Sequence, residues 1–193
     1  MPLTTPQLRL LTAICDRLIP PGPEGPSATE AGVVTFIERQ LDGPWGHGAR
    51  MYREGPFVQP DAGHGWQSPL TPAEVYAHGL DAIARHVRER HDGELADLDP
   101  AAQDEIVTAW EAGELTTFSE VDGRAFFAMV RQNAVEGLLS DPGYGGNRDM
   151  VGWRWLGYPG VARAHGDDYR DHIGRHGEPY SAEPVALEPR PRR

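Results

Sequence analysis

Apolar residues recur at the three- and four-residue spacing of amphipathic helices in five stretches of the chain. The clearest stretch begins at a capping box, in which Thr71 is the N-cap and Glu74 stands three residues later. Its expected buried side consists of Tyr76, Leu80, Ile83 and Val87. The other helices are expected from Thr5, as N-cap, to Pro20, from about Thr29 to Leu41, from Asp99 through Trp110, and from Ser119 through Leu138. Because no alternating strand pattern of useful length occurs, the sequence predicts an all-α fold, a small bundle of about five helices.

Glycine, proline and aromatic residues are concentrated in long segments between and after these helices. Residues 42–70 form one such loop, which contains Trp45, Tyr52 and Trp66. Aromatic side chains are costly to leave in water, so we expect them to pack on the helices or on another protein. We therefore expect one helical domain over residues 1–160, followed over residues 161–193 by an extended polar tail that wraps a partner or is disordered.

The acidic charge balance excludes two classes of partner. The 193 residues carry a formal net charge of -11, and such a surface repels nucleic-acid phosphates and anionic lipid headgroups. No apolar run reaches the roughly 18 to 20 residues that cross a bilayer, so we expect no membrane insertion. The first residues lack the pattern of an export signal. We expect a cytoplasmic protein, which becomes periplasmic or membrane-associated only if a signal-bearing partner carries it out.

Catalytic chemistry finds little support in the residues. The chain contains no lysine, which excludes Schiff-base enzymes, and its one cysteine, Cys15, falls on the apolar side of the first helix, where an inert thiol is expected. His78 and His86 are expected at the surface or the rim of their helix. Weak candidates for a metal site are Asp168, His172 and His176, of which the two histidines have the spacing of a helical ligand pair. We therefore expect no catalytic residue, no bound cofactor and no metal site in this chain.

The residues from Asp141 to Gly160, named here the signature segment, follow the last expected helix. Asp141 is placed to cap the turn at Pro142, and the glycines and Asn147 tolerate left-handed backbone around Tyr144. An aromatic patch follows. The residues that we single out as structural or interface anchors are Asp141, Pro142, Tyr144, Gly145, Gly146, Asn147, Arg148, Asp149, Trp153, Trp155, Tyr158 and Pro159, with Trp45, Tyr52 and Trp66 of the earlier loop.

The signature segment resembles the C-terminal part of the gluconate 2-dehydrogenase subunit 3 family. The resemblance rests on the runs Asp141–Asp149 and Leu156–Gly160, with Gly152 and Trp153 between them. The start of the chain is similar to the same family, through the run Leu18–Pro21 and through residues 31–37. Together these similarities cover roughly residues 7–160.

The resemblance implies a small, non-catalytic subunit of a sugar or polyol dehydrogenase complex. In such complexes a large flavoprotein of the glucose–methanol–choline oxidoreductase family holds the FAD and the substrate, and in many a cytochrome c or another acceptor carries the electrons onward. The small subunit helps the large one to fold and commonly bears a twin-arginine signal, which this sequence lacks. The residues themselves leave two alternatives. One is a free-standing enzyme or metalloprotein that uses Asp168, His172 and His176, and the other is a stand-alone helical protein that binds a small molecule or a metal.

Overall fold

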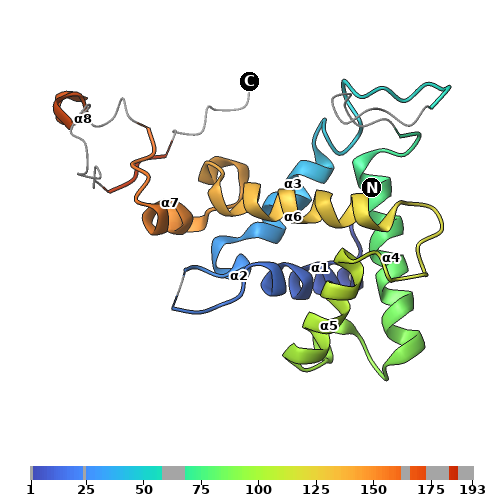
Figure 1. The fold of residues 1–193 in the computed structure, drawn as a ribbon. Coiled ribbons are helices and arrows are strands. Elements are labelled where there is room, and N and C mark those ends of the chain that lie inside the picture. Colours follow the sequence, from blue (N-terminus) through green and yellow to red (C-terminus); the bar gives the residue numbers. More distant parts are fainter. Residues whose placement is uncertain (1, 24, 58–67, 162–165, 173–182, 187–193) are drawn as a thin grey trace.

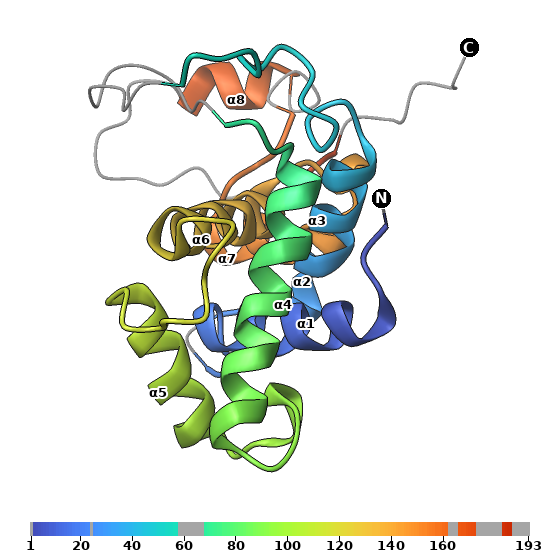
Figure 2. The same ribbon diagram turned by 90° about the vertical axis from the view of Figure 1, so that its right-hand side faces the viewer.

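The computed structural model describes residues 2–23, 25–57, 68–161, 166–172 and 183–186. Within these ranges the chain is helical, and the only β-type pairings are two isolated bridges. The helices are α1 (Thr5–Leu18), α2 (Ala28–Ala31), α3 (Val33–Asp42), α4 (Pro72–Arg90), α5 (Pro100–Glu111), α6 (Gly123–Leu139), α7 (Val151–Leu156) and α8 (Gly166–His172). Three short 3₁₀ turns are η1 (Leu95–Asp97), η2 (Pro142–Tyr144) and η3 (Arg148–Met150). The predicted all-α fold is confirmed (Figures 1 and 2).

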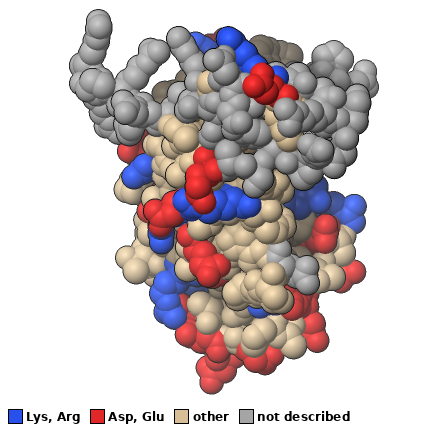
Figure 3. All heavy atoms as spheres, turned by 90° about the vertical axis from the view of Figure 1, so that its left-hand side faces the viewer, with Lys and Arg blue, Asp and Glu red and all other residues tan. Residues whose placement is uncertain are grey.

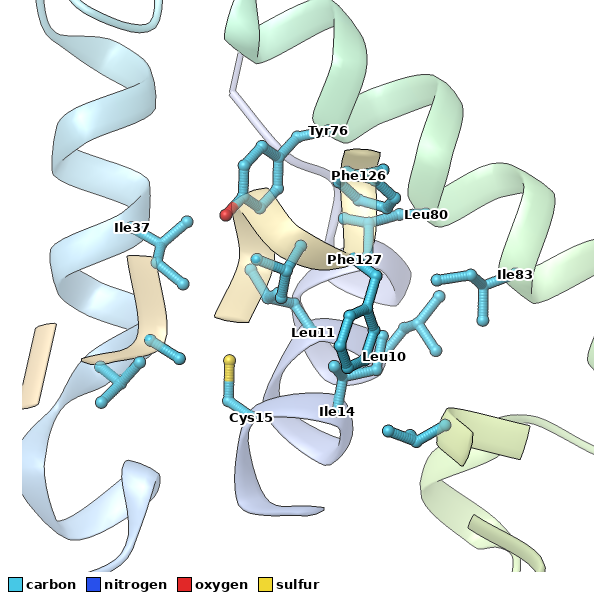
Figure 4. Close-up of a cluster of buried hydrophobic side chains, with 14 of the residues drawn as sticks. Leu10, Leu11, Ile14, Cys15, Ile37, Tyr76, Leu80, Ile83, Phe126 and Phe127 are labelled. Atoms are coloured by element: carbon cyan, nitrogen blue, oxygen red, sulfur yellow. The ribbon is translucent and has the colours of Figure 1, made fainter. Parts of the chain in front are cut away.

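Helix α1 lies at the centre of the bundle, where it contacts α2, α3, α4, α5 and α6. Its residues Leu11, Ile14 and Cys15 have no exposed surface. Figure 4 shows them in one cluster with Ile37 of α3 and Tyr76 of α4. Because burying one such side chain contributes about 1.5–3 kcal/mol, this cluster is the main source of the bundle's stability.

An aromatic cluster joins α4, α5 and α6. The rings of Tyr76 and Phe126 meet edge to face with centroids 5.3 Å apart, and Trp110 meets Phe127 in the same way at 5.0 Å. Gly79 permits the close approach of α4 to α6, since a Cβ atom at this position would lie 2.2 Å from a ring carbon of Phe126. The four residues Tyr76, Leu80, Ile83 and Val87 are all buried, as the spacing predicts.

The five predicted helical stretches all form helices, but their boundaries differ in places. The N-cap of α1 is Thr4 rather than Thr5, because the Thr4 hydroxyl accepts from the Gln7 backbone. The N-cap of α6 is Asp122, three residues after the expected start. The second stretch is divided into α2 and α3 at Gly32, whose φ of 70° lies in the left-handed region that ends a helix. Helices α7 and α8 were not predicted.

A part of the C-terminal tail returns to the end of the signature segment. The Val185 amide donates to the Pro159 carbonyl at 3.2 Å, and the Val161 amide donates to the Val185 carbonyl at 2.8 Å. These two bonds form a short parallel bridge. None of the helices within the described ranges combines the length and the apolar character needed to cross a membrane.

Candidate functional site

The signature segment folds into two turns, η2 and η3, followed by α7. Asp141 is the N-cap of η2, as predicted, and its carboxylate accepts from the Gly143 amide at 2.9 Å. The chain then reverses through left-handed backbone at Gly145 (φ 101°) and Asn147 (φ 44°). Asp149 and Met150 also have positive φ values, of 53° and 59°. Such backbone is costly for residues other than glycine, so contacts with the rest of the bundle must hold it in place.

Asn147 supplies those contacts and has no exposed surface. Its backbone amide donates to the Gly137 carbonyl at 2.8 Å, and its side-chain amide donates to the Ser140 carbonyl at 2.9 Å. Its side-chain oxygen accepts from the Gly152 amide at 2.9 Å. One buried side chain therefore ties the end of α6 to the start of α7.

Two glycines of the segment are required by close packing against α6. A Cβ atom at Gly146 would lie 2.1 Å from the Gly137 carbonyl oxygen. One at Gly152 would lie 2.2 Å from the Leu138 carbonyl oxygen. Trp153 adds a third link, because its buried indole donates to the Leu139 carbonyl at 2.8 Å. This inward half of the segment has a structural role that the fold explains.

The other half of the segment points outward. Trp155, Leu156 and Tyr158 are 53%, 55% and 49% exposed, and Val185 of the returning tail, which pairs with Gly160, is 39% exposed. These four residues are named here the aromatic face. The Trp155 ring lies against Gly25, since a Cβ atom at that position would be 2.8 Å from ring carbon Cε2. The face is thus held in position, yet about half of each of its large side chains remains in contact with water.

The signature segment and the helices before it match one known family. The sequence model of the family described as gluconate 2-dehydrogenase subunit 3 matches residues 5–160. This chain belongs to the gluconate 2-dehydrogenase subunit 3 family. The suspected resemblance is confirmed, and the family name indicates a subunit of a multi-subunit dehydrogenase complex. No curated protein and no solved structure gives a significant match.

The loop residues predicted as anchors in this subunit 3 protein have different surroundings. Trp45 is half-buried and lines an open groove of about 560 Å³ together with Met51 and Met129. Tyr52 is 52% exposed. Trp66 lies outside the described residues. The structure thus places one of the three on the bundle and one in solvent, and their role as partner contacts stays a prediction.

The fold buries two side chains of the subunit that could in principle react, Cys15 and His86. Burial raises the pKa of the Cys15 thiol to about 12, so the inert thiol predicted for α1 is confirmed. His86 is 7% exposed and so lies deeper than the surface or rim position expected for it, because the buried side of α4 is wide enough to include it. Burial and the Arg90 guanidinium, which donates to the ring at 3.0 Å, lower the pKa of His86.

Two further histidines, His78 and His47, make local contacts. His78 lies near the surface, as expected, with its ring nitrogen 2.6 Å from the Glu120 carboxylate. His47 donates to the Gly43 carbonyl at 2.8 Å. These contacts account for both rings without a catalytic role.

The weak metal candidates fall at the edge of the described region. His172 is the last residue of α8, and Asp168 belongs to the same helix, whereas His176 lies outside the described residues. Among the residues that the structure describes, no group of three or more His, Cys, Asp or Glu side chains could hold a metal ion. A metal site formed by Asp168, His172 and His176 therefore stays a prediction.

Sequence reasoning missed one residue of the site. Arg39 of α3 lies beside Gly145, although more than a hundred residues separate the two in the chain. A Cβ atom at Gly145 would lie 2.8 Å from the Arg39 side chain. No motif marks Arg39, because its place at the site arises only when α3 packs on α6.

Proposed function

We propose that this chain is the non-catalytic small subunit that stabilises a large FAD-dependent dehydrogenase of the glucose–methanol–choline type and assists its maturation. The partner binds FAD and oxidises a sugar or polyol, and it passes the electrons to a cytochrome c or another acceptor. The proposal is supported by membership of the subunit 3 family over residues 5–160.

The observation that carries the proposal is the aromatic face. Large apolar side chains that are rigidly held and half exposed are typical of surfaces that a partner protein covers. Aromatic residues are enriched at the centres of such interfaces, where they contribute most of the binding energy. Trp155, Leu156 and Tyr158 of the aromatic face belong to the signature segment, which lies within the residues that the family model matches. This joins the structural feature to the family's role as a subunit.

The reactive groups in the chain support a non-catalytic role. A nucleophilic cysteine needs an accessible thiolate, and Cys15 is buried with a raised pKa. A general base needs to reach its substrate, and His86 is enclosed by the bundle. Reactions on the substrate are accordingly assigned to the partner.

The test is co-purification of the full-length tagged chain from its native host, with a visible spectrum of the product. A flavin spectrum that travels with a protein of several hundred residues is the expected result, and haem bands would add the electron acceptor. A colourless chain that purifies alone, or with a tightly bound small molecule, would support the stand-alone alternative instead.

Variants of the aromatic face sharpen this test. The double change Trp155→Ala and Tyr158→Ala is expected to lose the flavoprotein, because it removes both large rings from the surface. Val135→Ala is the control, because Val135 of α6 is 48% exposed and belongs neither to the aromatic face nor to the 42–70 loop. Equal recovery of flavin with both variants would contradict docking through the aromatic face.

A further inference from the structure

Two arginine side chains gather at the turn between η2 and η3. A Cβ atom at Gly145 would lie 2.8 Å from Cδ and 3.0 Å from Nε of Arg39. A Cβ atom at Gly32 would lie 3.2 Å from Nη2 of Arg148 and also 3.2 Å from the Gly145 carbonyl oxygen. Arg39 of α3 and Arg148 of η3 therefore both lie beside Gly145, and they are named here the arginine pair.

The arginine pair is exposed and has no anionic partner within the described residues. Acidic residues stand next to both members in the sequence, Glu38 before Arg39 and Asp149 after Arg148, but neither forms an ion pair with them. Some arginines elsewhere on the surface do form ion pairs with carboxylates. Such ion pairs are Arg9 with Glu94 and Asp97, Arg17 with Asp104, and Arg154 with Glu183.

The two guanidinium groups place positive charge at one turn of a protein whose formal net charge is -11. Figure 3 shows the face of the molecule that carries α7: basic and acidic side chains both lie across its middle, and acidic ones also gather at its lower end. The arginine pair is a local site of positive charge on a protein with a net negative charge.

The turn that carries Arg148 is rigid. Asn147, the preceding residue, is fixed by three hydrogen bonds, and Gly145 holds a left-handed conformation against the Arg39 side chain. Tyr144, which is 60% exposed, lies next to Gly145 and adds an aromatic ring with a hydroxyl. A site that is ordered before binding loses less entropy when its ligand arrives.

We propose that the arginine pair binds carboxylate side chains of an acidic segment on the surface of the large dehydrogenase subunit. This inference rests on the proposed function and names the chemistry of one part of that interface. Guanidinium groups bind carboxylates through paired, charge-assisted hydrogen bonds, which lysine cannot form with the same geometry. The charge of the site selects an anionic partner segment, and the overall negative charge of the chain disfavours an extended polyanion. Tyr144 packs against the same segment.

The chain offers a matched control for this proposal. Arg85 and Arg88 of α4 are also exposed and also make no hydrogen bond or ion pair within the described residues. Helix α4 lies on the opposite side of the bundle from α7 (Figure 1). The double change Arg85→Gln and Arg88→Gln therefore removes two positive charges, as the test variant does, but at a place distant from the proposed site.

The experiment uses complexes of the full-length chain with the FAD-loaded large subunit, purified after co-expression, and measures the dissociation constant between 50 and 500 mM NaCl. These salt concentrations span roughly the range over which the Debye length shortens from above 10 Å to a few ångströms. The double change Arg39→Gln and Arg148→Gln is expected to weaken binding at least about tenfold at low salt and to reduce its salt dependence. The α4 control is expected to bind as the unchanged chain does. Binding and salt dependence of the Arg39→Gln, Arg148→Gln chain within twofold of the unchanged chain would overturn the inference.

A second variant identifies the group on the partner. Because the chain contains no lysine, Arg148→Lys introduces its only side-chain amine. A carbodiimide, which joins amines to carboxylates without a spacer, is expected to link this lysine to an Asp or Glu of the large subunit. Arg85→Lys is expected to give no link between subunits. If the Arg148→Lys complex forms but its lysine links only to its own chain, the inference is wrong while the proposed function stands. If the unchanged chain fails to bind the flavoprotein at all, the proposed function fails first.

Discussion

Replacing Asn147 by alanine is expected to destabilise the bundle more than the loss of one small polar side chain would ordinarily do. The change removes the acceptor of the buried Gly152 amide and the donor to the Ser140 carbonyl. Each buried group that loses its partner costs roughly 1–3 kcal/mol. Alanine is also poorly suited to the left-handed backbone at φ 44°, which adds about 1 kcal/mol. The free energy of unfolding is therefore expected to fall by about 3–7 kcal/mol, a large part of the roughly 5–15 kcal/mol of a typical domain.

The assay is urea unfolding of the full-length chain, followed by tryptophan fluorescence, in which Trp153 reports on the neighbouring contacts. Asn147→Gly separates the two contributions, because glycine loses the same two hydrogen bonds but accepts positive φ. It is expected to be about 1 kcal/mol more stable than Asn147→Ala. Tyr144→Ala, in the same loop but on its exposed side, is expected to change stability by no more than about 0.5 kcal/mol. A loss below about 1 kcal/mol for Asn147→Ala would refute the view that Asn147 holds the segment together.

Three further predictions concern the bundle. Gly79→Ala would ordinarily stabilise a helix by about 1 kcal/mol, but here the added carbon meets the Phe126 ring at 2.2 Å, so urea unfolding is expected to show a loss of about 2 kcal/mol. Tyr76→Phe leaves the buried Asn133 side chain without the hydroxyl that donates to it at 2.8 Å, and the same measurement is expected to show a loss of about 1–2 kcal/mol. Burial raises the pKa of Cys15 from 9.0 to about 12, so the unfolded chain loses the thiol proton at a lower pH than the folded chain does. The free energy of unfolding is therefore expected to fall as the pH rises from 9 to about 12. At pH 8, reaction of Cys15 with a disulfide reagent is expected to follow the rate of unfolding.

Local signals explain why most of the helices could be predicted. The capping box of α4 lies within four consecutive residues, Thr71 to Glu74, and the structure reproduces both of its hydrogen bonds. The break at Gly32 could not be predicted in the same way, because Gly32 falls within an otherwise regular apolar pattern. Its surroundings come from distant residues: the Arg148 side chain and the Gly145 carbonyl lie against it. A helix boundary that is set by tertiary contacts leaves no local pattern to detect.

The signature segment shows a different limit of sequence reasoning. Its residue types marked the segment as a site. In an irregular turn, however, no repeating spacing tells which side chains face the bundle and which face solvent. Asn147 has no exposed surface, whereas the next residue, Arg148, is exposed. Helix α7 was missed because it is six residues long and begins and ends at left-handed residues, so packing against α6 rather than its own sequence stabilises it.

The division of the segment into two sides connects its structure to its proposed role. Asn147 and Trp153 bind the end of α6, and this attachment fixes the direction in which Arg148 and Trp155 point. A segment held in this way can present charged and aromatic groups to a partner without ordering a loop first, which reduces the entropic cost of association. The two sides can therefore be separated by mutation: inward changes should lower the free energy of unfolding, and outward changes should leave it nearly unchanged while weakening the complex. A Tyr144 or Arg148 variant that unfolds as readily as the Asn147 variant would show that the two sides are not independent.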